Sequence, residues 1–437
     1  MEMIPRRVSA AILNSLASGV VPRIGLGYIA VGRAQEISAI MGDLNTIEDG
    51  GAMFRFIIGR YGAGKSFLLQ MVRNYAMDKG FVVCDCDLSP HRRLCGTKSE
   101  GLATYRELIS RMSTKLRPDG GAIEAIIQKW VNGIRSELAP LYGGLGGHGL
   151  AAAVEERIIS SLASIQEFAH GFDFAASVAA YYKAYEAGDE DGIASALKWL
   201  KGDFSTKREA RSQLPVGEAV NDENWYETLK LMAAFLKTAG YSGLVCFLDE
   251  GVNLYKIPNR ISREKNYEKL LTIFNDAMQG KAKHIGFYMA GTLQFVEDER
   301  KGLFSYEALK SRLSENRFSE YASENALIGP TIKLPRLSDS EIFLLLEKIR
   351  DIHASHYEYE TQVSGDDISL FIQACLSSAG ATDFITPREL AKDFIGALGA
   401  LSNASAMNMK TLLEATGFKP SQPAGNEEED EFTPFEL

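Results

Sequence analysis

The stretch Gly59-Arg60-Tyr61-Gly62-Ala63-Gly64-Lys65-Ser66 has the residue types and spacing of a phosphate-binding loop. Glycines at these places let backbone N–H groups approach phosphate oxygens closely. Lys65 is expected to reach the β- and γ-phosphates of ATP, and Ser66 is expected to ligate Mg²⁺. We therefore predict that this phosphate loop, with the adjoining Phe67, binds ATP and Mg²⁺. The alternative is a chance glycine loop before a buried helix.

Two adjacent carboxylates, Asp249 and Glu250, follow the apolar residues 244–248, as in a Walker B sequence. Asp249 is expected to hold the Mg²⁺ shell, and Glu250 is expected to act as a general base that polarises the attacking water. Taken alone, such residues would more often be a buried strand followed by a polar turn. The phosphate loop elsewhere in the chain favours the catalytic interpretation, and hydrolysis of ATP is the predicted reaction.

These groups need strands and helices that place them, and the chain supplies an alternating pattern. Residues 54–58 are apolar, rich in β-forming types and end at Gly59, after which a helix is expected. Strands that alternate with helices predict a parallel sheet with right-handed crossovers. Strands are expected at residues 54–58, 81–87, 244–248, 285–290 and 330–334, and helices at 67–77, 104–116, 225–239 and 267–279.

The composition of successive segments predicts the domain organisation. Residues 117–216 are rich in Ala, Glu and Lys and are broken by glycines at 143–147 and by an acidic turn at 188–192, which indicates a helical insertion. Capping boxes are expected at Ser338 with Glu341 and at Thr386 with Glu389. The predicted parts are an N-terminal helical linker (1–50), an ATPase core (51–116 and 217–336), the insertion (117–216), a helical lid (337–419) and a disordered acidic tail (420–437).

Charge and cysteine content exclude few functions. The net charge is −10, but six acids and no basic residue lie in Ser421–Leu437, so residues 1–420 carry only −4. The five cysteines form no CxxC pair, which argues against a zinc site or a disulfide framework. No apolar run approaches the roughly 20 residues that cross a bilayer, and no secretory signal is recognised at the start. A cytoplasmic location is the expectation.

Together these residues resemble the BREX-type ATP-binding family, the BrxC/BrxD group of AAA+ ATPases in bacterial anti-phage defence, and the chain length is similar to the short BrxD-like form. The similarity runs from about Val21 to about Lys410. The stretches LDEGVNLY and SYEAL are more specific to this family than the Walker sequences are. The similar segments are Val31-Gly32-Arg33, the phosphate loop and residues 67–69, 87–90, 248–255, 262–268, 291–292 and 300–309.

The resemblance implies a P-loop AAA+ (additional-strand) ATPase core with a parallel sheet, a large helical insertion and a helical C-terminal lid. In such ATPases a polar residue at the tip of the strand between the Walker strands contacts the γ-phosphate or the attacking water, a role that Thr292 fits. A helix at the subunit boundary offers an arginine to the neighbouring γ-phosphate. Arg312 and Arg317 are the candidates, although a solvated basic helix end is an equal alternative. Arg388 resembles the second sensor, with a structural ion pair as the alternative.

For function, the resemblance implies an oligomeric ATPase in antiviral defence that acts on DNA, beside a helicase or another defence protein. The leading hypothesis is a motor that remodels DNA or a DNA-bound partner. A nucleotide-gated assembly scaffold is the runner-up. A small-molecule kinase is a weaker reading because the carboxylate pair suits water activation, and a GTPase is weaker still because no NKxD sequence occurs. For the acidic tail, the two interpretations are a segment that docks a partner and a segment that is only solvated.

Overall fold

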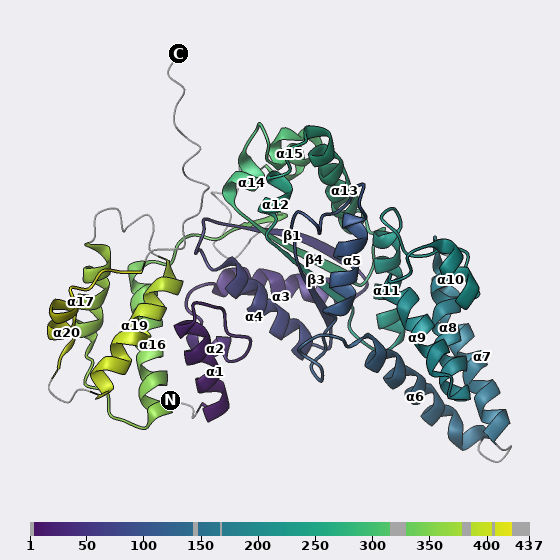
Figure 1. The fold of residues 1–437 in the computed structure, drawn as a ribbon, viewed down its shortest axis with the longest axis horizontal. Helices are drawn as coiled ribbons and strands as arrows, with labels where there is room; N and C mark the ends of the chain where they lie inside the picture. Colours follow the sequence, from purple (N-terminus) through teal and green to yellow (C-terminus); the bar gives the residue numbers. More distant parts are fainter. Residues whose placement is uncertain are drawn as a thin grey trace. The chain divides into compact units, whose positions relative to one another are not determined.

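The computed structural model describes residues 4–142, 147–166, 168–314, 329–377, 386–403 and 407–421. By its contacts the chain divides into two units (Figure 1). The sheet unit comprises Gln35–Ile58 and Val72–Ile332, and the helical unit comprises Met1–Ala34, Gly59–Met71 and Lys333–Leu437. The phosphate loop therefore belongs by its contacts to the helical unit, although it directly follows a strand of the sheet unit.

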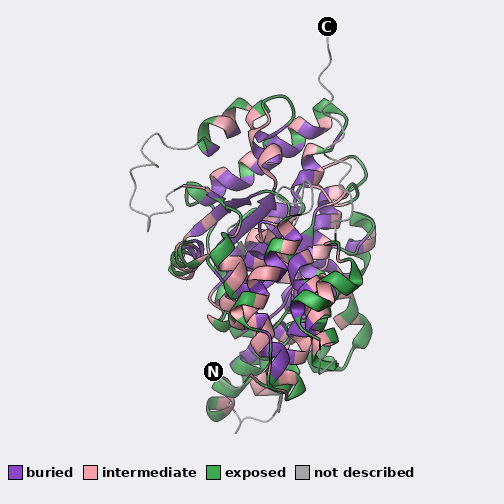
Figure 2. Ribbon diagram, turned by 90° about the vertical axis from the view of Figure 1, so that its left-hand side faces the viewer, coloured by how far each residue is buried: buried purple, intermediate pink, exposed green. Residues whose placement is uncertain are grey.

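A five-stranded sheet forms the centre of the sheet unit, and its strands are largely buried (Figure 2). The strand order is β2-β3-β4-β1-β5, so β4 separates β1 from β3. The pairs β1–β4, β3–β4 and β2–β3 are parallel, which confirms the expected α/β arrangement. The bounds are Ala52–Ile58 for β1, Val82–Asp87 for β2, Leu244–Asp249 for β3, Ile285–Gly291 for β4 and Thr331–Lys333 for β5.

One face of the sheet is apolar and is covered by α11 (Trp225–Thr238) and α13 (Arg260–Met278). Phe54 of β1 and Phe287 of β4 are register partners whose rings stack at 5.7 Å between centroids. Phe274 of α13 meets Phe54 edge-on at 5.8 Å, and Tyr226 of α11 lies 6.3 Å from Phe287. Successive side chains of a strand alternate between the two faces of the sheet. The residues next to these aromatic residues in each strand therefore point to the opposite face.

The opposite face carries charged side chains that helices α3 (Ala34–Glu48) and α4 (Lys65–Asp78) neutralise. Arg55 of β1 donates from Nε to Asp43 Oδ2 at 2.8 Å and from Nη2 to Asp43 Oδ1 at 2.7 Å. Arg73 of α4 donates to Asp85 of β2 at 2.8 Å. Arg55, Asp43 and Arg73 are buried, so each charge depends on its partner.

The expected helical region before β3 packs on α11 and joins the main hydrophobic cluster. The ring of Phe235 in α11 meets Trp130 at 5.2 Å and Phe174 at 5.8 Å, and Phe174 meets Trp199 at 6.3 Å. These aromatic contacts tie the segment to the helix beside the sheet. Its helices are α6 (Ile123–Tyr142), α7 (Gly147–Gln166), α8 (Gly171–Ala187), α9 (Glu190–Leu200) and α10 (Lys207–Gln213).

Two expected helix boundaries are wrong for identifiable reasons. Helix α5 spans Glu100–Ser110 rather than 104–116, because the chain then turns to bridge β2 through Val83 and Ser113. Helix α13 starts at Arg260 rather than 267, because the side chain of Asn259 caps it by accepting from the backbone N of Ser262. The remaining elements of the sheet unit are α12 (Val252–Tyr255), α14 (Leu293–Glu297), the 3₁₀ turn Leu303–Ser305 and α15 (Glu307–Leu313).

In the helical unit the start of the chain packs against its C-terminal helices. Helix α1 contacts α16 and α19, and the three lie side by side in Figure 1. Their buried cluster includes Ile12, Ile349 and Leu390. The helices are α1 (Arg6–Ala17), α2 (Leu26–Ile29), α16 (Asp339–Tyr357), α17 (Gly365–Leu376), α19 (Pro387–Asn403) and α20 (Met409–Thr416). Across the described parts of both units, none of the helices has the length and apolarity needed to cross a bilayer.

One of the two expected capping boxes is confirmed, and the other is formed only in part. Ser338 and Glu341 form the reciprocal bonds at the start of α16. At α19 the hydroxyl of Thr386 is buried and has no hydrogen-bond partner among the described residues. Its methyl group instead lies directly over Gly62 of the phosphate loop. The carboxylate of Glu389 still accepts from the backbone N–H of Thr386, so only the hydroxyl half of the box is missing.

Candidate nucleotide-binding site

The phosphate loop has a backbone that requires glycine at two places. Gly62 has φ +74° and Gly64 has φ +89°, the left-handed region that disfavours side chains. A Cβ on Gly62 would also overlap the Thr386 side chain. A Cβ on Gly64 would meet nothing within 4 Å, so open space lies beside that residue. The loop thus exposes backbone at Gly64 and is closed by Thr386 at Gly62.

The donors of the loop suit phosphate oxygens. Lys65 Nζ lies 3.0 Å from both Gly59 O and Arg60 O, so the ammonium group stays at the loop. Among the described residues the structure gives no hydrogen-bond partner to the backbone N–H groups of Gly62 and Gly64. Helix α4 begins at Lys65, and Ser66 is exposed in its first turn. Free N–H groups and a helix start are what an anionic phosphate needs.

Arg33 holds the loop from a distant part of the sequence, and its role was not predicted. Its Nη2 donates to Ala63 O at 3.1 Å and to Pro335 O at 2.6 Å. Arg33 has φ +67°, and Gly32 before it leaves no room for a Cβ beside the Glu341 carboxylate. The segment Val31-Gly32-Arg33 carried part of the family resemblance, and that was the available signal.

Two more predicted residues lie in the helical unit near the loop. Arg388 is exposed at the start of α19, and its Nη1 lies 3.4 Å from the hydroxyl of Tyr61. Phe67 is half-buried and packs against the cluster of α1, α16 and α19. Tyr61 of the loop and Arg388, the predicted second sensor, are thus brought together. Phe67 instead contributes to the apolar packing of the helical unit.

The predicted carboxylates lie in the sheet unit at the carboxyl end of β3. Asp249 is the register partner of Asp87 on β2, and its Oδ1 accepts the backbone N–H of Glu250 at 2.8 Å. Glu250 is exposed and has φ +57°, a left-handed conformation that costs a non-glycine residue roughly 1 kcal/mol or more. Strain of this kind at the end of a strand is typical of functional residues.

The carboxylate turn, residues 249–255, is fixed by contacts that explain the LDEGVNLY sequence. The backbone N of Gly251 donates to Ala290 O at 3.0 Å, and a Cβ on Gly251 would come within 2.7 Å of that oxygen. Asn253 Nδ2 donates to Leu88 O at 2.9 Å and to Glu250 O at 3.3 Å. The hydroxyl of Tyr255 donates to Asp298 Oδ2 at 2.8 Å. The turn is thereby held to β2, to β4 and to the segment after α14.

The electrostatics of this edge suit a divalent cation. Burial and the nearby charge of Asp249 raise the pKa of Asp87, while Arg111 and Arg92 oppose the rise. In the part of the chain that the structure describes, no group of three or more His, Cys, Asp or Glu side chains could hold a metal ion. Mg²⁺ commonly takes only one or two carboxylates and completes its shell with phosphates and water. Asp249 and Ser66 each carry an oxygen donor of the kind that such a site uses, and their joint role as Mg²⁺ ligands stays a prediction.

The remaining predicted residues lie in different surroundings. Thr292 directly follows β4, and its hydroxyl caps α14 by accepting from the backbone N of Phe295 at 3.1 Å. Arg312 is exposed on α15, donating to Asn275 Oδ1 at 3.0 Å and to Ala308 O at 2.7 Å. Arg317 and most of the acidic tail lie outside the described residues. The contacts of Thr292 and Arg312 are structural, and their catalytic roles stay predictions.

A parallel α/β sheet with a strand, glycine loop and helix defines this chain as a P-loop nucleotide-binding protein. The family model of the BREX system ATP-binding protein BrxC/D matches residues 4–417. The chain therefore belongs to this family of ATP-binding proteins, as the resemblance indicated. A search among curated proteins gave no match.

Proposed function

We propose that this protein is an additional-strand AAA+ ATPase of anti-phage defence, which hydrolyses ATP to remodel DNA or a DNA-bound partner such as a helicase. The observation that carries the proposal is the position of β4 between β1 and β3, together with Glu250 exposed at the end of β3 in a left-handed conformation. This strand order is the one expected of an additional-strand core. An exposed carboxylate held in a strained turn suits the activation of water.

The residues divide the reaction among them as follows. Lys65 and the backbone N–H groups of the loop bind the β- and γ-phosphates, while Ser66 and Asp249 supply oxygen ligands for Mg²⁺, which stabilises the charge of the transferred phosphate. Glu250 accepts the proton of the attacking water. In this proposal Thr292 orients that water, Arg388 senses the nucleotide from the helical unit, and Arg312 or Arg317 reaches the site of a neighbouring copy.

A nucleotide-gated assembly scaffold is the second candidate function. The contacts of the phosphate loop with other residues of the helical unit support it. Arg33 binds a carbonyl of the loop, Thr386 packs on Gly62, and Arg388 lies at Tyr61. ATP bound at the loop would therefore act on the helical unit even without hydrolysis. In this alternative ATP binding organises a defence complex, and hydrolysis only resets it.

The variant Glu250→Gln separates the two candidates. It is expected to bind ATP normally and to lose phosphate release, because the amide cannot accept the proton. Glu268→Gln, at an exposed glutamate of α13, is the matched control and should keep full turnover. Phage protection is then measured in cells that carry the rest of the BREX system. Lost protection supports the motor; full protection without hydrolysis supports the scaffold, and undiminished phosphate release excludes Glu250 as the base.

Substrate and partners need two further measurements on the wild-type chain. Phosphate release with ATP and with GTP, each with and without DNA, tests the kinase and GTPase alternatives. Particle mass with ATP, alone and with single-stranded or duplex DNA, tests the proposed oligomer and its DNA partner. Release from ATP only, and an oligomer that forms with nucleotide, are the expected results.

A further inference from the structure

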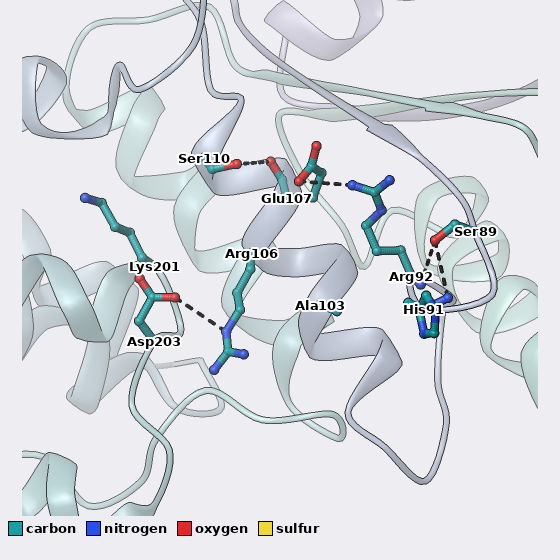
Figure 3. A pocket seen from close by; sticks show the side chains of 9 residues that line it. All are labelled: Ser89, His91, Arg92, Ala103, Arg106, Glu107, Ser110, Lys201 and Asp203. Carbon is teal, nitrogen blue, oxygen red and sulfur yellow. Dashed lines mark hydrogen bonds and ion pairs between the residues drawn. The ribbon is translucent and has the colours of Figure 1, made fainter.

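A pocket lies on the sheet unit near the carboxyl end of β2, and its lining includes no residue of the phosphate loop or the carboxylate turn. Its volume is about 490 Å³, within the range of sites that hold small organic ligands. It opens between the segment after β2, helix α5 and the residues that follow α9 (Figure 3). The lining residues are Ser89, His91, Arg92, Ala103, Arg106, Glu107, Ser110, Lys201 and Asp203. Ligands of parallel sheets commonly bind at the carboxyl ends of strands, and Ser89 lies just beyond such an end.

The charge of this pocket is positive in a chain whose net charge is −10. Arg92, Arg106 and Lys201 face two carboxylates, and each carboxylate already has an arginine partner. Glu107 lies 3.2 Å from Arg92 Nη1 and 2.7 Å from Arg111 Nε, and Asp203 lies 3.5 Å from Arg106 Nε. The acids are thus neutralised and the cations are left in excess.

Several donors in the pocket have no hydrogen-bond partner in the part of the chain that the structure describes. Arg106 uses Nε for Gly202 O at 2.8 Å, and its two terminal nitrogens have no partner among the described residues. The same holds for the ammonium group of Lys201. Figure 3 shows Arg106 between Lys201 and Asp203 on one side and Arg92 on the other. A planar guanidinium with free terminal N–H groups is the side chain best suited to bind phosphate in two places.

We propose that this pocket binds a phosphate-bearing ligand of nucleotide size. Arg106 and Lys201 donate to its phosphate, and Arg92 adds charge while it stays paired with Glu107. The ligand is either a free mononucleotide or one phosphodiester unit of a nucleic acid strand, since both present the same anionic group. None of the lining residues belongs to the phosphate loop or to the carboxylate turn, so the proposal does not depend on hydrolysis of ATP.

Binding to a short fluorescein-labelled oligothymidylate, measured by fluorescence anisotropy, tests this pocket. Lys201→Glu and Arg106→Gln are each expected to weaken binding by about tenfold, the loss of one charge-assisted contact. Arg157→Gln removes an exposed arginine that, like Arg106, has one carboxylate partner, and it should bind as the wild type does. The affinity for a fluorescent ATP analogue should be equal in all four proteins, which separates this site from the phosphate loop.

Competition with thymidine monophosphate and with inorganic phosphate distinguishes the sources of the ligand. Displacement by the mononucleotide identifies a free nucleotide as sufficient, whereas its failure assigns the site to a nucleic acid strand. The proposal is overturned if the wild type binds neither the oligonucleotide nor the mononucleotide, or if Lys201→Glu binds both as tightly as the wild type. Lys201 has no partner among the described residues, so Lys201→Glu tests the proposal even if Arg106→Gln unfolds.

Discussion

The phosphate loop and the carboxylate turn are the two predicted parts of the nucleotide site, and each is held in its own way. The loop depends on glycine conformations and on Arg33 and Thr386, which approach it from both ends of the sequence. The turn depends on strand register, with Asp249 beside Asp87 and with Asn253 bonded to the carbonyl after β2. Changes in the helical unit should therefore alter ATP affinity, and changes at the turn should alter the rate of hydrolysis.

The largest expected effect is on the free energy of unfolding, through the buried ion pair between Arg55 of β1 and Asp43 of α3. Asp43→Ala leaves Arg55 buried without its partner, and such a change costs about 3–5 kcal/mol of unfolding free energy. Urea denaturation of the purified protein measures this loss. The double variant Asp43→Leu with Arg55→Met removes both charges and should regain most of the stability. Equal stability of Asp43→Ala and the wild type would show that the pair does not support the strand before the loop.

A smaller effect, on ATP affinity, is expected at the phosphate loop. Lys65→Ala removes the main side-chain cation of the β- and γ-phosphates and should weaken ATP binding by roughly a hundredfold. Titration with a fluorescent ATP analogue measures the affinity. Lys79→Ala removes a partly exposed lysine just after α4, whose Nζ donates to Asn45, and is the matched control. Normal affinity in Lys65→Ala would overturn the assignment of the loop.

How much of this site could be predicted from the sequence depended on the distance between partners in the chain. The loop and the pair Asp249-Glu250 are local patterns, and both lie at strand ends as expected. Arg33 acts on Ala63 and Pro335, and Thr386 packs on Gly62, which are contacts across 30 to more than 300 residues. No periodicity or spacing records such contacts.

The same limit explains the errors in local structure. The Thr386 sequence favours a capping box, but packing on Gly62 turned the side chain to another use. The helical pattern after residue 104 continues past Ser110, yet pairing with β2 at Ser113 ended the helix. In both places a tertiary contact was stronger than the local preference. Local chemistry sets the Ser338 box, which was predicted correctly, and also the Asn259 cap of α13, which was missed.

The carboxylate turn offers a sharper test of the comparison through Asn253. Asn253→Ala removes the bonds to Leu88 O and Glu250 O, so Glu250 should spend less time in its left-handed conformation. We expect kcat for ATP hydrolysis to fall about tenfold with little change in KM, since one or two hydrogen bonds are lost. Steady-state phosphate release measures both constants. Asn45→Ala, at an exposed asparagine of α3, is the control, and a rise in KM with unchanged kcat would assign Asn253 to binding instead.

The smallest expected effect is a loss of ATP affinity on substitution of Arg33. This substitution also tests whether the phosphate loop and the carboxylate turn have separate roles. Arg33→Ala removes the donor to Ala63 O and Pro335 O and should lower ATP affinity by about fivefold, which corresponds to roughly 1 kcal/mol. Arg33→Lys keeps one donor, so its ATP affinity should lie between that of the wild type and that of Arg33→Ala. Arg6→Ala, an exposed arginine of α1 in the same unit, should have no effect. If Arg33→Ala instead lowered kcat and left the affinity unchanged, the helical unit would act on chemistry rather than on binding, and the two parts of the site could not be assigned separate roles.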